Sequence, residues 1–150
     1  ADFDDRGLLL TKKEHKDNVE FDFTASPDLA QTVAVTCALK GIKCRMTGLH
    51  SLRIKETDRI AALQTELQKI RANLVEEQEN TWYVEPAPPI KSLSPIRIST
   101  YDDHRMAMAF APLATMADVM IEEPDVVQKS YPDFWIEMQK AGFKTEIRTV

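Results

Sequence analysis

The sequence has no long hydrophobic run and no excess of positive charge. No stretch approaches the roughly 18 consecutive apolar residues of a membrane-spanning helix, and we expect no signal peptide, because no basic segment precedes an apolar one at the N-terminus. The formal net charge of −5 argues against a general attraction to nucleic acid or to an anionic membrane. Any anion-binding role must therefore come from a local cluster of Lys and Arg.

Cysteine is also scarce. Cys37 and Cys44 are the two cysteines of the chain, and their spacing fits neither a disulfide framework nor a zinc site. We expect both to be buried, reduced thiols in a cytoplasmic protein. The 150 residues, of which 43% are hydrophobic, suffice for one globular domain with a core.

The first half of the chain alternates strands and helices. Alternating apolar residues predict strands over 19–23 and 42–47. Ser26-Pro27-Asp28 is typical of a helix start, and a buried helix over 29–39 should follow, ended by Gly41. Apolar residues at helical spacing predict an amphipathic helix over 60–70, and a hairpin follows over 74–85.

The second half repeats this order at an offset of about 75 residues. Asp103 corresponds to Asp28, and Lys129 corresponds approximately to Lys55. The expected elements are a strand at 96–98, a buried helix over 106–116 that Pro112 bends, a strand at 119–121, a helix from Ser130 to Gly142 and a strand over 144–148. Two units, roughly 19–85 and 95–148, predict an α/β domain in which helices cover one sheet.

The segment from Arg53 to Arg59 carries three cations and two carboxylates at the start of the amphipathic helix. Free backbone N–H groups at a helix N-terminus can bind an anion, and Arg can hold a carboxylate or phosphate through two parallel hydrogen bonds. The alternative is a solvated charged loop in which Asp58 complements the helix dipole.

The segment Tyr101-Asp102-Asp103-His104-Arg105 opens the second buried helix. Asp102 or Asp103 could serve as N-cap and His104 as a structural histidine. In the functional interpretation, Arg105 binds an anion, since an Arg beside so apolar a helix needs a partner. Neither a metal site nor a Ser/His/Asp triad is predicted, because the required ligand spacing and the Gly-x-Ser-x-Gly pattern are missing.

Lys129 and Asp28 are unremarkable alone, as a surface lysine and a carboxylate in a helix's first turn. Their places in the repeat change this interpretation, because repeated units carry their loops on the same face. We therefore expect four loops to meet at one end of the sheet and form a basic pocket with acidic residues inside it.

The strings Arg53-Ile54-Lys55-Glu56-Thr57-Asp58-Arg59 and Asp102-Asp103-His104-Arg105-Met106-Ala107-Met108 resemble those of the EPSP synthase family. Ser26-Pro27-Asp28 and Lys129-Ser130-Tyr131-Pro132-Asp133 match in the same order. The resemblance spans roughly residues 19–143. It implies part of the C-terminal lobe of an inside-out α/β barrel, whose other lobe is absent from this chain.

The resemblance also implies a reaction. Phosphoenolpyruvate would transfer its carboxyvinyl group to the 5-hydroxyl of shikimate 3-phosphate and release phosphate, in aromatic amino-acid biosynthesis, with no metal or organic cofactor. The implied roles are the following: Asp28 accepts the hydroxyl proton and holds shikimate 3-phosphate, Glu56 handles the methylene proton, Lys55 assists both, and Arg59, Arg105 and Lys129 bind phosphoenolpyruvate. His104 and Ser51 would support the site, and glyphosate would use the same cations in a complete enzyme.

Two departures from the family pattern qualify these expectations. Ser51-Leu52 stands where some members have Asn-Trp, and the chain covers about two of the three units of one lobe. We therefore expect this chain to be inactive alone. The alternatives are a non-catalytic module that binds a phosphorylated ligand, and a sibling transferase with another acceptor such as a nucleotide sugar.

Overall fold

The structure, a computed structural model, describes residues 2–4, 7–9, 14, 16–54, 57–86, 88–90 and 94–146. The strands are β1 (Asp2–Asp4), β2 (Gly7–Leu9), β3 (Asn18–Asp22), β4 (Lys43–Thr47), β5 (Asn73–Gln78), β6 (Thr81–Glu85), β7 (Ile96–Ile98) and β8 (Val119–Ile121). The α-helices are α1 (Ala30–Lys40), α2 (Arg59–Lys69), α3 (His104–Phe110) and α4 (Phe134–Lys140). Short 3-10 helices are η1 (Pro27–Leu29), η2 (His50–Ile54), η3 (Ala111–Thr115) and η4 (Pro124–Lys129).

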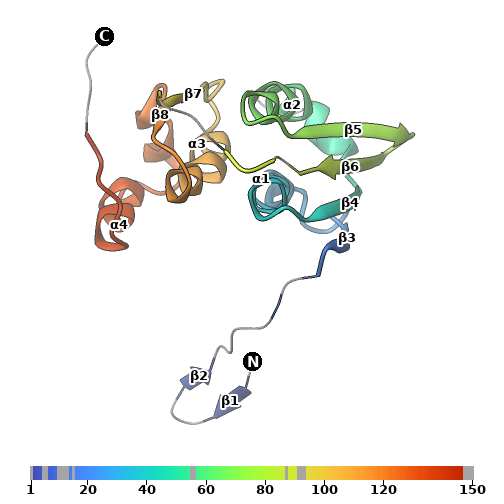
Figure 1. Cartoon of the computed structure of the whole chain (residues 1–150), viewed down its shortest axis with the longest axis horizontal. Helices are drawn as coiled ribbons and strands as arrows, with labels where there is room; N and C mark the ends of the chain where they lie inside the picture. The colour runs from blue at the N-terminus through green and yellow to red at the C-terminus, as the bar shows by residue number, and fades with distance from the viewer. Residues whose placement is uncertain are drawn as a thin grey trace.

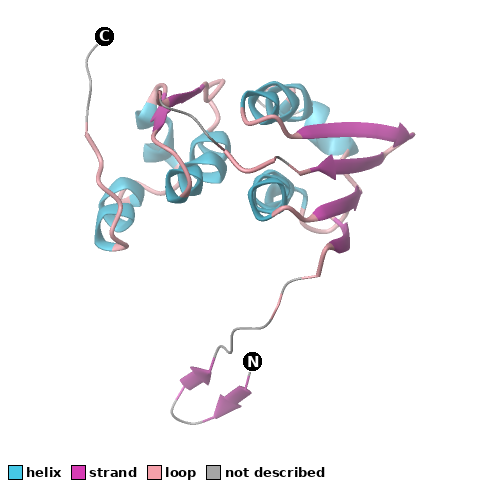
Figure 2. Cartoon of the chain, viewed as in Figure 1, coloured by secondary structure: helices cyan, strands magenta, loops and turns pink. Residues whose placement is uncertain are grey.

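The main sheet has four strands in the order β3-β4-β6-β5. β3 and β4 are parallel, whereas β6 pairs antiparallel with both β4 and β5. Helices α1 and α2 lie between this sheet and the part of the molecule that contains α3, β7 and β8 (Figures 1 and 2). β7 and β8 form a separate parallel pair, and β1 and β2 form an antiparallel pair. The predicted α/β class is therefore confirmed, whereas the expectation of one sheet was wrong, because β7 and β8 of the second unit pair apart from the main sheet.

Periodicity located the buried faces correctly. The α2 positions Ile60, Leu63 and Leu67, with Ile70 after them, are at most 2% exposed, and Cys44 and Met46 of β4 are fully buried. α1 packs against α3 through their small-residue surfaces. Small side chains let the two helix backbones approach closely. Because both helices are packed inside the fold in this way, their sequences are apolar on most faces.

The predicted irregularity at Pro112 is confirmed. α3 ends at Phe110, and Pro112 lies in the first turn of η3. A proline inside a helix lacks the N–H for the hydrogen bond to the preceding turn and crowds that turn, so the α-helical pattern cannot continue unchanged through it. α4 ends at Lys140, close to the expected stop at Gly142.

Two expectations were wrong in detail. Leu29 belongs to η1 rather than to the buried helix and is 58% exposed. Residues 144–146 do not form a strand, and 147–148 lie outside the described residues.

The two units share one arrangement. In each, a strand, a buried helix and a second strand parallel to the first follow in order: β3–α1–β4 and β7–α3–β8. The structure describes the hairpin β5–β6 in the first unit. The two units thus share the order and the parallel pairing of their elements, although their residues differ.

None of the described helices has the length and hydrophobicity needed to span a bilayer. Cys37 and Cys44 are free and buried, as expected. The Cys37 thiol and burial together raise the pKa of Cys44 well above its usual value, which makes Cys44 a poor nucleophile.

Candidate active site

Arg59 is the centre of a charged cluster. It occupies the first position of α2, and 1% of its side chain is exposed. Its Nε donates to the Asp103 carboxylate at 2.6 Å, and its Nη1 donates to Asp28 Oδ1 at 3.2 Å. A buried guanidinium requires compensation of this kind, since an unpaired buried charge is costly. Arg59 therefore joins segments 31 and 44 residues away in the sequence.

Asp28 links Arg59 to Arg105. Its Oδ2 accepts from Arg105 Nη2 at 2.7 Å, while its Oδ1 accepts from Arg59. The side chains of Asp28 and Arg105 are 46% and 27% exposed. The structure thus brings three of the predicted site residues together from η1, α2 and α3. We name Asp28, Arg59, Asp103 and Arg105 the arginine cluster.

The two aspartates of the arginine cluster differ in accessibility. The Asp103 side chain is 1% exposed, like its partner Arg59, whereas Asp28 and Arg105 both reach solvent. The four formal charges cancel. Because Asp28 and Arg105 are both partly exposed, this pair can separate without uncovering a buried charge, whereas the Arg59–Asp103 pair cannot.

The helix starts beside the cluster are capped by side chains. Asp58 accepts from the N–H groups of Ile60 and Ala61 at 3.1 and 3.0 Å, and Asp103 accepts from the Arg105 N–H at 2.9 Å. These amides are not available to a ligand, which corrects the expectation of free N–H groups at the start of α2. Side-chain cations, not these backbone amides, must provide the anion affinity.

A close approach of two loops positions this end of the sheet. Gly48, after β4, has a φ of +75°, and a Cβ there would lie 2.3 Å from the backbone nitrogen of Thr24, after β3. The Asp22 carboxylate accepts from the Thr24 N–H and hydroxyl at 2.9 and 2.7 Å, which lowers the pKa of Asp22. η1 packs against η2 just beyond. The ends of the parallel strands thus carry Asp28 and Ser51 to neighbouring positions.

Lys55 and Glu56 lie outside the described residues. The chain is described up to Ile54 at the end of η2 and again from Thr57. Ser51 is half-buried in η2, next to the fully buried Leu52. The predicted roles of these two residues in proton transfer therefore remain predictions. Glu56 and Lys55 precede Arg59 by three and four positions in the sequence.

Lys129 and His104 are near the arginine cluster in different ways: Lys129 lines a hollow together with Asp102, and His104 directly follows Asp103. Lys129, exposed at the end of η4, lines an open hollow of about 440 Å³ with Asp102, Glu123, Asp125 and Val126. His104 Nδ1 lies 3.9 Å from Asp103 Oδ1. η4, which ends at Lys129, packs against α3, the helix that contains Arg105.

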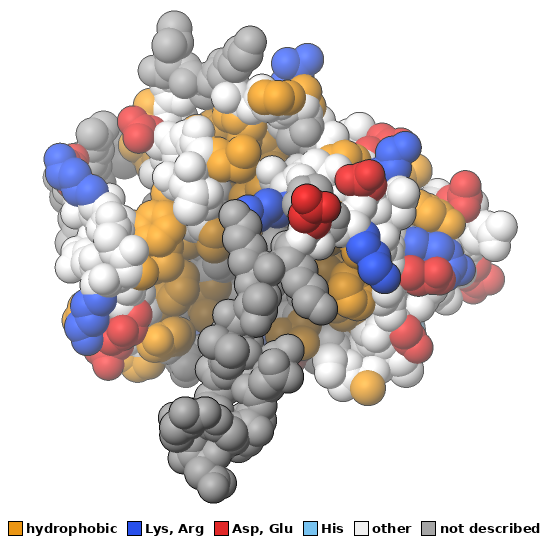
Figure 3. Space-filling model, turned by 60° about the horizontal axis from the view of Figure 1, so that its bottom comes forward, with side chains coloured by type: hydrophobic (Ala, Val, Ile, Leu, Met, Phe, Trp, Pro, Cys, Tyr) orange, Lys and Arg blue, Asp and Glu red, His pale blue; other side chains and the backbone are white. Residues whose placement is uncertain are grey.

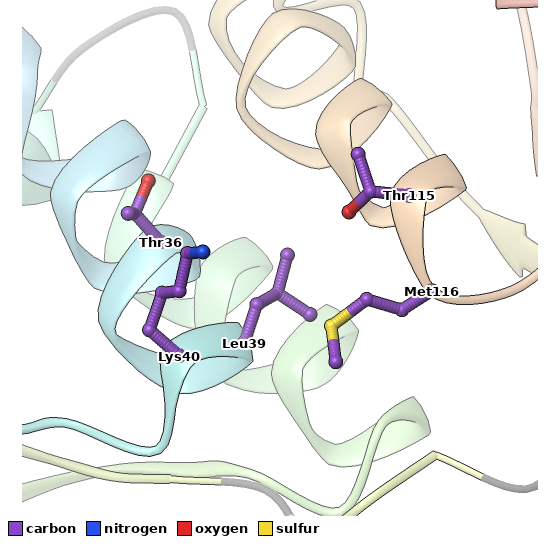
Figure 4. A pocket seen from close by; sticks show the side chains of 5 residues that line it. All are labelled: Thr36, Leu39, Lys40, Thr115 and Met116. Atoms are coloured by element: carbon purple, nitrogen blue, oxygen red, sulfur yellow. The ribbon is translucent and has the colours of Figure 1, made fainter. Parts of the chain in front are cut away.

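A second hollow, of about 320 Å³, lies elsewhere (Figure 4). Thr36, Leu39 and Lys40 of α1 line it together with Thr115 and Met116, and the Leu39 and Met116 side chains extend toward one another. These α1 residues are in the C-terminal half of the helix, away from Asp28 before its start. This hollow has one cation and an apolar floor, so we do not assign the chemistry to it.

The sequence did not single out Asp103 as a site residue beyond a capping role. Its equivalence to Asp28 in the repeat was visible, but its contact with Arg59 spans 44 residues and has no local signature. Among the described residues, no group of three or more His, Cys, Asp or Glu is arranged to hold a metal ion.

Comparison with known proteins gives one consistent result. A sequence model of the family described as EPSP synthase (3-phosphoshikimate 1-carboxyvinyltransferase) matches residues 4–138. The 3-phosphoshikimate 1-carboxyvinyltransferase of Bacteroides fragilis is 43% identical over 149 residues, which are 98% of this chain and 36% of that protein. The enzyme of the same name from Cellvibrio japonicus is 45% identical over 116 residues, or 76% and 26% of the two chains.

A solved structure of EPSP synthase from Acinetobacter baumannii superposes with a TM-score of 0.65 at 25% identity, and it covers 83% of this chain and 29% of that one. The chain thus spans about a third of the length of the curated relatives it matches. Its fold is part of one lobe of the inside-out α/β barrel, as the resemblance implied. With the motif strings, the arginine cluster and these matches in agreement, the chain belongs to the EPSP synthase (3-phosphoshikimate 1-carboxyvinyltransferase) family.

Proposed function

We propose that this chain contributes the phosphoenolpyruvate half of a carboxyvinyl-transferase site. The observation that carries the proposal is the convergence of Asp28, Arg59 and Arg105 from three separate segments. A buried Arg pairs with an acid for stability alone, but an exposed Arg and an exposed Asp held beside it provide an exchangeable anion site. The substrates would be phosphoenolpyruvate and shikimate 3-phosphate, the two implied by the family resemblance.

The reaction requires two proton transfers. The acceptor 5-hydroxyl loses its proton as its oxygen attacks phosphoenolpyruvate, and the methylene carbon gains a proton, which gives a tetrahedral intermediate. Loss of phosphate and of one methyl proton then forms the enolpyruvyl ether. We assign the hydroxyl proton to Asp28, the methylene proton to Glu56 with help from Lys55, and the phosphoenolpyruvate anion to Arg59, Arg105 and Lys129.

The geometry refines two of these roles. Arg105 is the accessible arginine, so we assign it the direct contact with the phosphoenolpyruvate carboxylate. Arg59 is nearly inaccessible and supplies positive potential from beneath. When an anion binds Arg105, the Asp28 carboxylate can separate from one of its two cations and turn toward the acceptor hydroxyl.

The rest of the site would come from sequence outside this chain. Hydrophobic side chains gather on one face of the molecule (Figure 3), and large apolar residues such as Leu29 and Ile54 are 58% and 83% exposed. Exposed apolar surface of this kind is typical of an unfilled interface. We therefore propose a second lobe as the partner of this chain. We also propose a cytoplasmic location, which the two free cysteines support.

A chimera tests the function. This chain replaces the matching third of the Bacteroides fragilis enzyme, and phosphate release is measured with both substrates. We expect turnover by the chimera and none by the isolated 150-residue chain. Glu56→Gln should lower kcat by about 10²–10⁴-fold with modest change in KM, whereas Glu79→Gln, in the exposed β5–β6 turn, should match the parent chimera.

The alternatives predict other results. A non-catalytic module would bind phosphoenolpyruvate but release no phosphate, and Glu56→Gln would change nothing. A sibling transferase would release phosphate only when shikimate 3-phosphate is replaced by another acceptor, such as a nucleotide sugar. Full turnover by the isolated chain would contradict the proposed requirement for a second lobe.

A further inference from the structure

Glu66 is a fully buried acid that the proposed chemistry does not use. It lies on α2, and it is 0% exposed. Its carboxylate accepts from the Tyr101 hydroxyl at 2.8 Å, from the Ser99 N–H at 3.2 Å and from Lys69 Nζ at 2.6 Å. Two of these three partners belong to the loop that precedes α3. A helix of the first unit therefore holds a loop of the second.

The same helix holds that loop a second time. Arg59 is seven residues before Glu66, so both project from one face of α2, about 10 Å apart along its axis. Glu66 binds the loop at Ser99 and Tyr101, and Arg59 binds its end at Asp103. The rigid helix thus fixes both ends of a five-residue segment, 99–103.

This segment has an unfavourable backbone. Tyr101 and Asp102 both have a φ of +55°, in the left-handed region that side chains with a Cβ disfavour. Two such residues in succession persist where surrounding contacts hold them. The bond from the Tyr101 hydroxyl to buried Glu66 and the bond from the Thr100 hydroxyl to Glu123 at 3.2 Å provide these contacts.

The segment ends at the arginine cluster. Asp103 follows Asp102 directly, caps α3 and binds Arg59, and Arg105 lies two residues further on, against Asp28. A change of backbone conformation at 101–102 would rotate Asp103 and the first turn of α3. It would thereby move the Arg105 guanidinium relative to Asp28.

We propose that Glu66 and Tyr101 are positioning residues of the phosphoenolpyruvate site: their hydrogen bond holds the 99–103 segment so that Asp103 and Arg105 meet Arg59 and Asp28. The inference rests on the proposed function and deepens it. Neither residue touches the substrate. Their effect passes through Asp103 and Arg105, so it falls more heavily on phosphoenolpyruvate than on the acceptor.

The test uses the chimera described above. Tyr101→Phe removes only the hydroxyl that binds Glu66, and Tyr83→Phe makes the same change in β6 of the main sheet. We expect Tyr101→Phe to raise the KM for phosphoenolpyruvate about tenfold, with the KM for shikimate 3-phosphate changed less than twofold. Glu66→Gln should also raise the KM for phosphoenolpyruvate. Adding Tyr101→Phe to Glu66→Gln should have little further effect, because both changes act on the hydrogen bond between these two residues.

Thermal unfolding separates positioning from mere stability. If Tyr101→Phe lowers Tm but leaves both KM values within twofold of the parent, the hydrogen bond only supports the fold and the proposal is wrong. Equal increases in both KM values also overturn it. Should Glu66→Gln fail to fold, Tyr101→Phe and Tyr83→Phe decide alone. A parent chimera without turnover would count against the proposed function, whereas a working parent with an unaffected Tyr101→Phe would count against this inference.

Discussion

Asp28 and Asp103 occupy equivalent positions of the repeat but have different roles. Each precedes a buried helix, and each accepts from Arg59. Asp103 is buried and also caps α3, so it fixes Arg59 in place. Asp28 is half exposed and shared with Arg105, so it can release a cation when an anion arrives. Burial, rather than residue type, decides which acid is structural and which is available for chemistry.

Replacing Asp103 tests the structural role. Asp103→Asn keeps an N-cap side chain for α3 but leaves the Arg59 charge without its closest partner. Removing one member of a buried ion pair costs about 3–5 kcal/mol, measurable as a shift in the urea midpoint of the chain. Asp58→Asn, at the cap of α2, is the matched control and should cost less than about 1 kcal/mol. Equal losses for the two variants would contradict the assigned role of Asp103.

Glu122 gives a pH-dependent prediction. Hydrogen bonds from the Ser99 hydroxyl and from Arg97 lower its pKa below the usual value. A depressed carboxyl pKa stabilises the folded state above the unfolded pKa, and this contribution is lost as the pH falls through the folded one. The side chain is 35% exposed, so the effect should stay below about 1 kcal/mol.

Denaturant unfolding checks this contribution of Glu122 to stability. The parent and Glu122→Gln are compared at neutral pH and at pH values below the usual carboxyl pKa. The difference in stability between the two should shrink as the solution is acidified. A constant difference over that range would mean that the ionisation of Glu122 does not contribute.

At the scale of elements, the fold requires the loops after β3 and β4 to approach one another closely. Gly48 and Gly41 both adopt positive φ, at +75° and +73°, but only a Cβ at Gly48 meets backbone atoms within 4 Å. Gly41→Ala should cost about 1 kcal/mol for the left-handed conformation alone. Gly48→Ala should destabilise the fold by about 2 kcal/mol more than Gly41→Ala, because the Thr24 backbone must move.

Thermal or urea unfolding of both alanine variants measures the difference between them. If Gly48→Ala and Gly41→Ala are equally destabilising, the loops after β3 and β4 do not approach as the structure describes. The positions of η1 and η2, and with them Asp28, would then need revision.

The elements themselves were largely predictable, for physical reasons that vary between them. The apolar spacing of Ile60, Leu63 and Leu67 identified α2, because an amphipathic helix has one buried face. Leu29 was misjudged, since apolar character does not reveal that a helix begins with an exposed 3-10 turn.

The members of the arginine cluster were predictable in part. Motif strings pointed to Asp28, Arg59 and Arg105, and the structure brings these three together. Contacts between segments far apart in the sequence were not visible, because no local pattern records them. Asp103 against Arg59 and Glu66 against Tyr101 are both of this kind, separated by 44 and 35 residues.

At the scale of the whole molecule, α2 joins the two repeated units. It packs beside the main sheet with the first unit, and its charged residues Arg59 and Glu66 hold the start of the second. The candidate site joins residues of both units and therefore depends on their relative placement. The first unit alone contains Asp28 and Arg59 but not the accessible Arg105.

We propose that Arg105, the accessible arginine of the arginine cluster, binds phosphoenolpyruvate, and the Kd of the chimera for phosphoenolpyruvate measures this contact. Arg105→Lys keeps the charge but removes the planar fork, so the Kd for phosphoenolpyruvate should rise about tenfold, or about 1.4 kcal/mol. Arg45→Lys, paired with Glu20 on the main sheet, should leave the Kd unchanged. A Kd within twofold of the parent for Arg105→Lys would contradict the account.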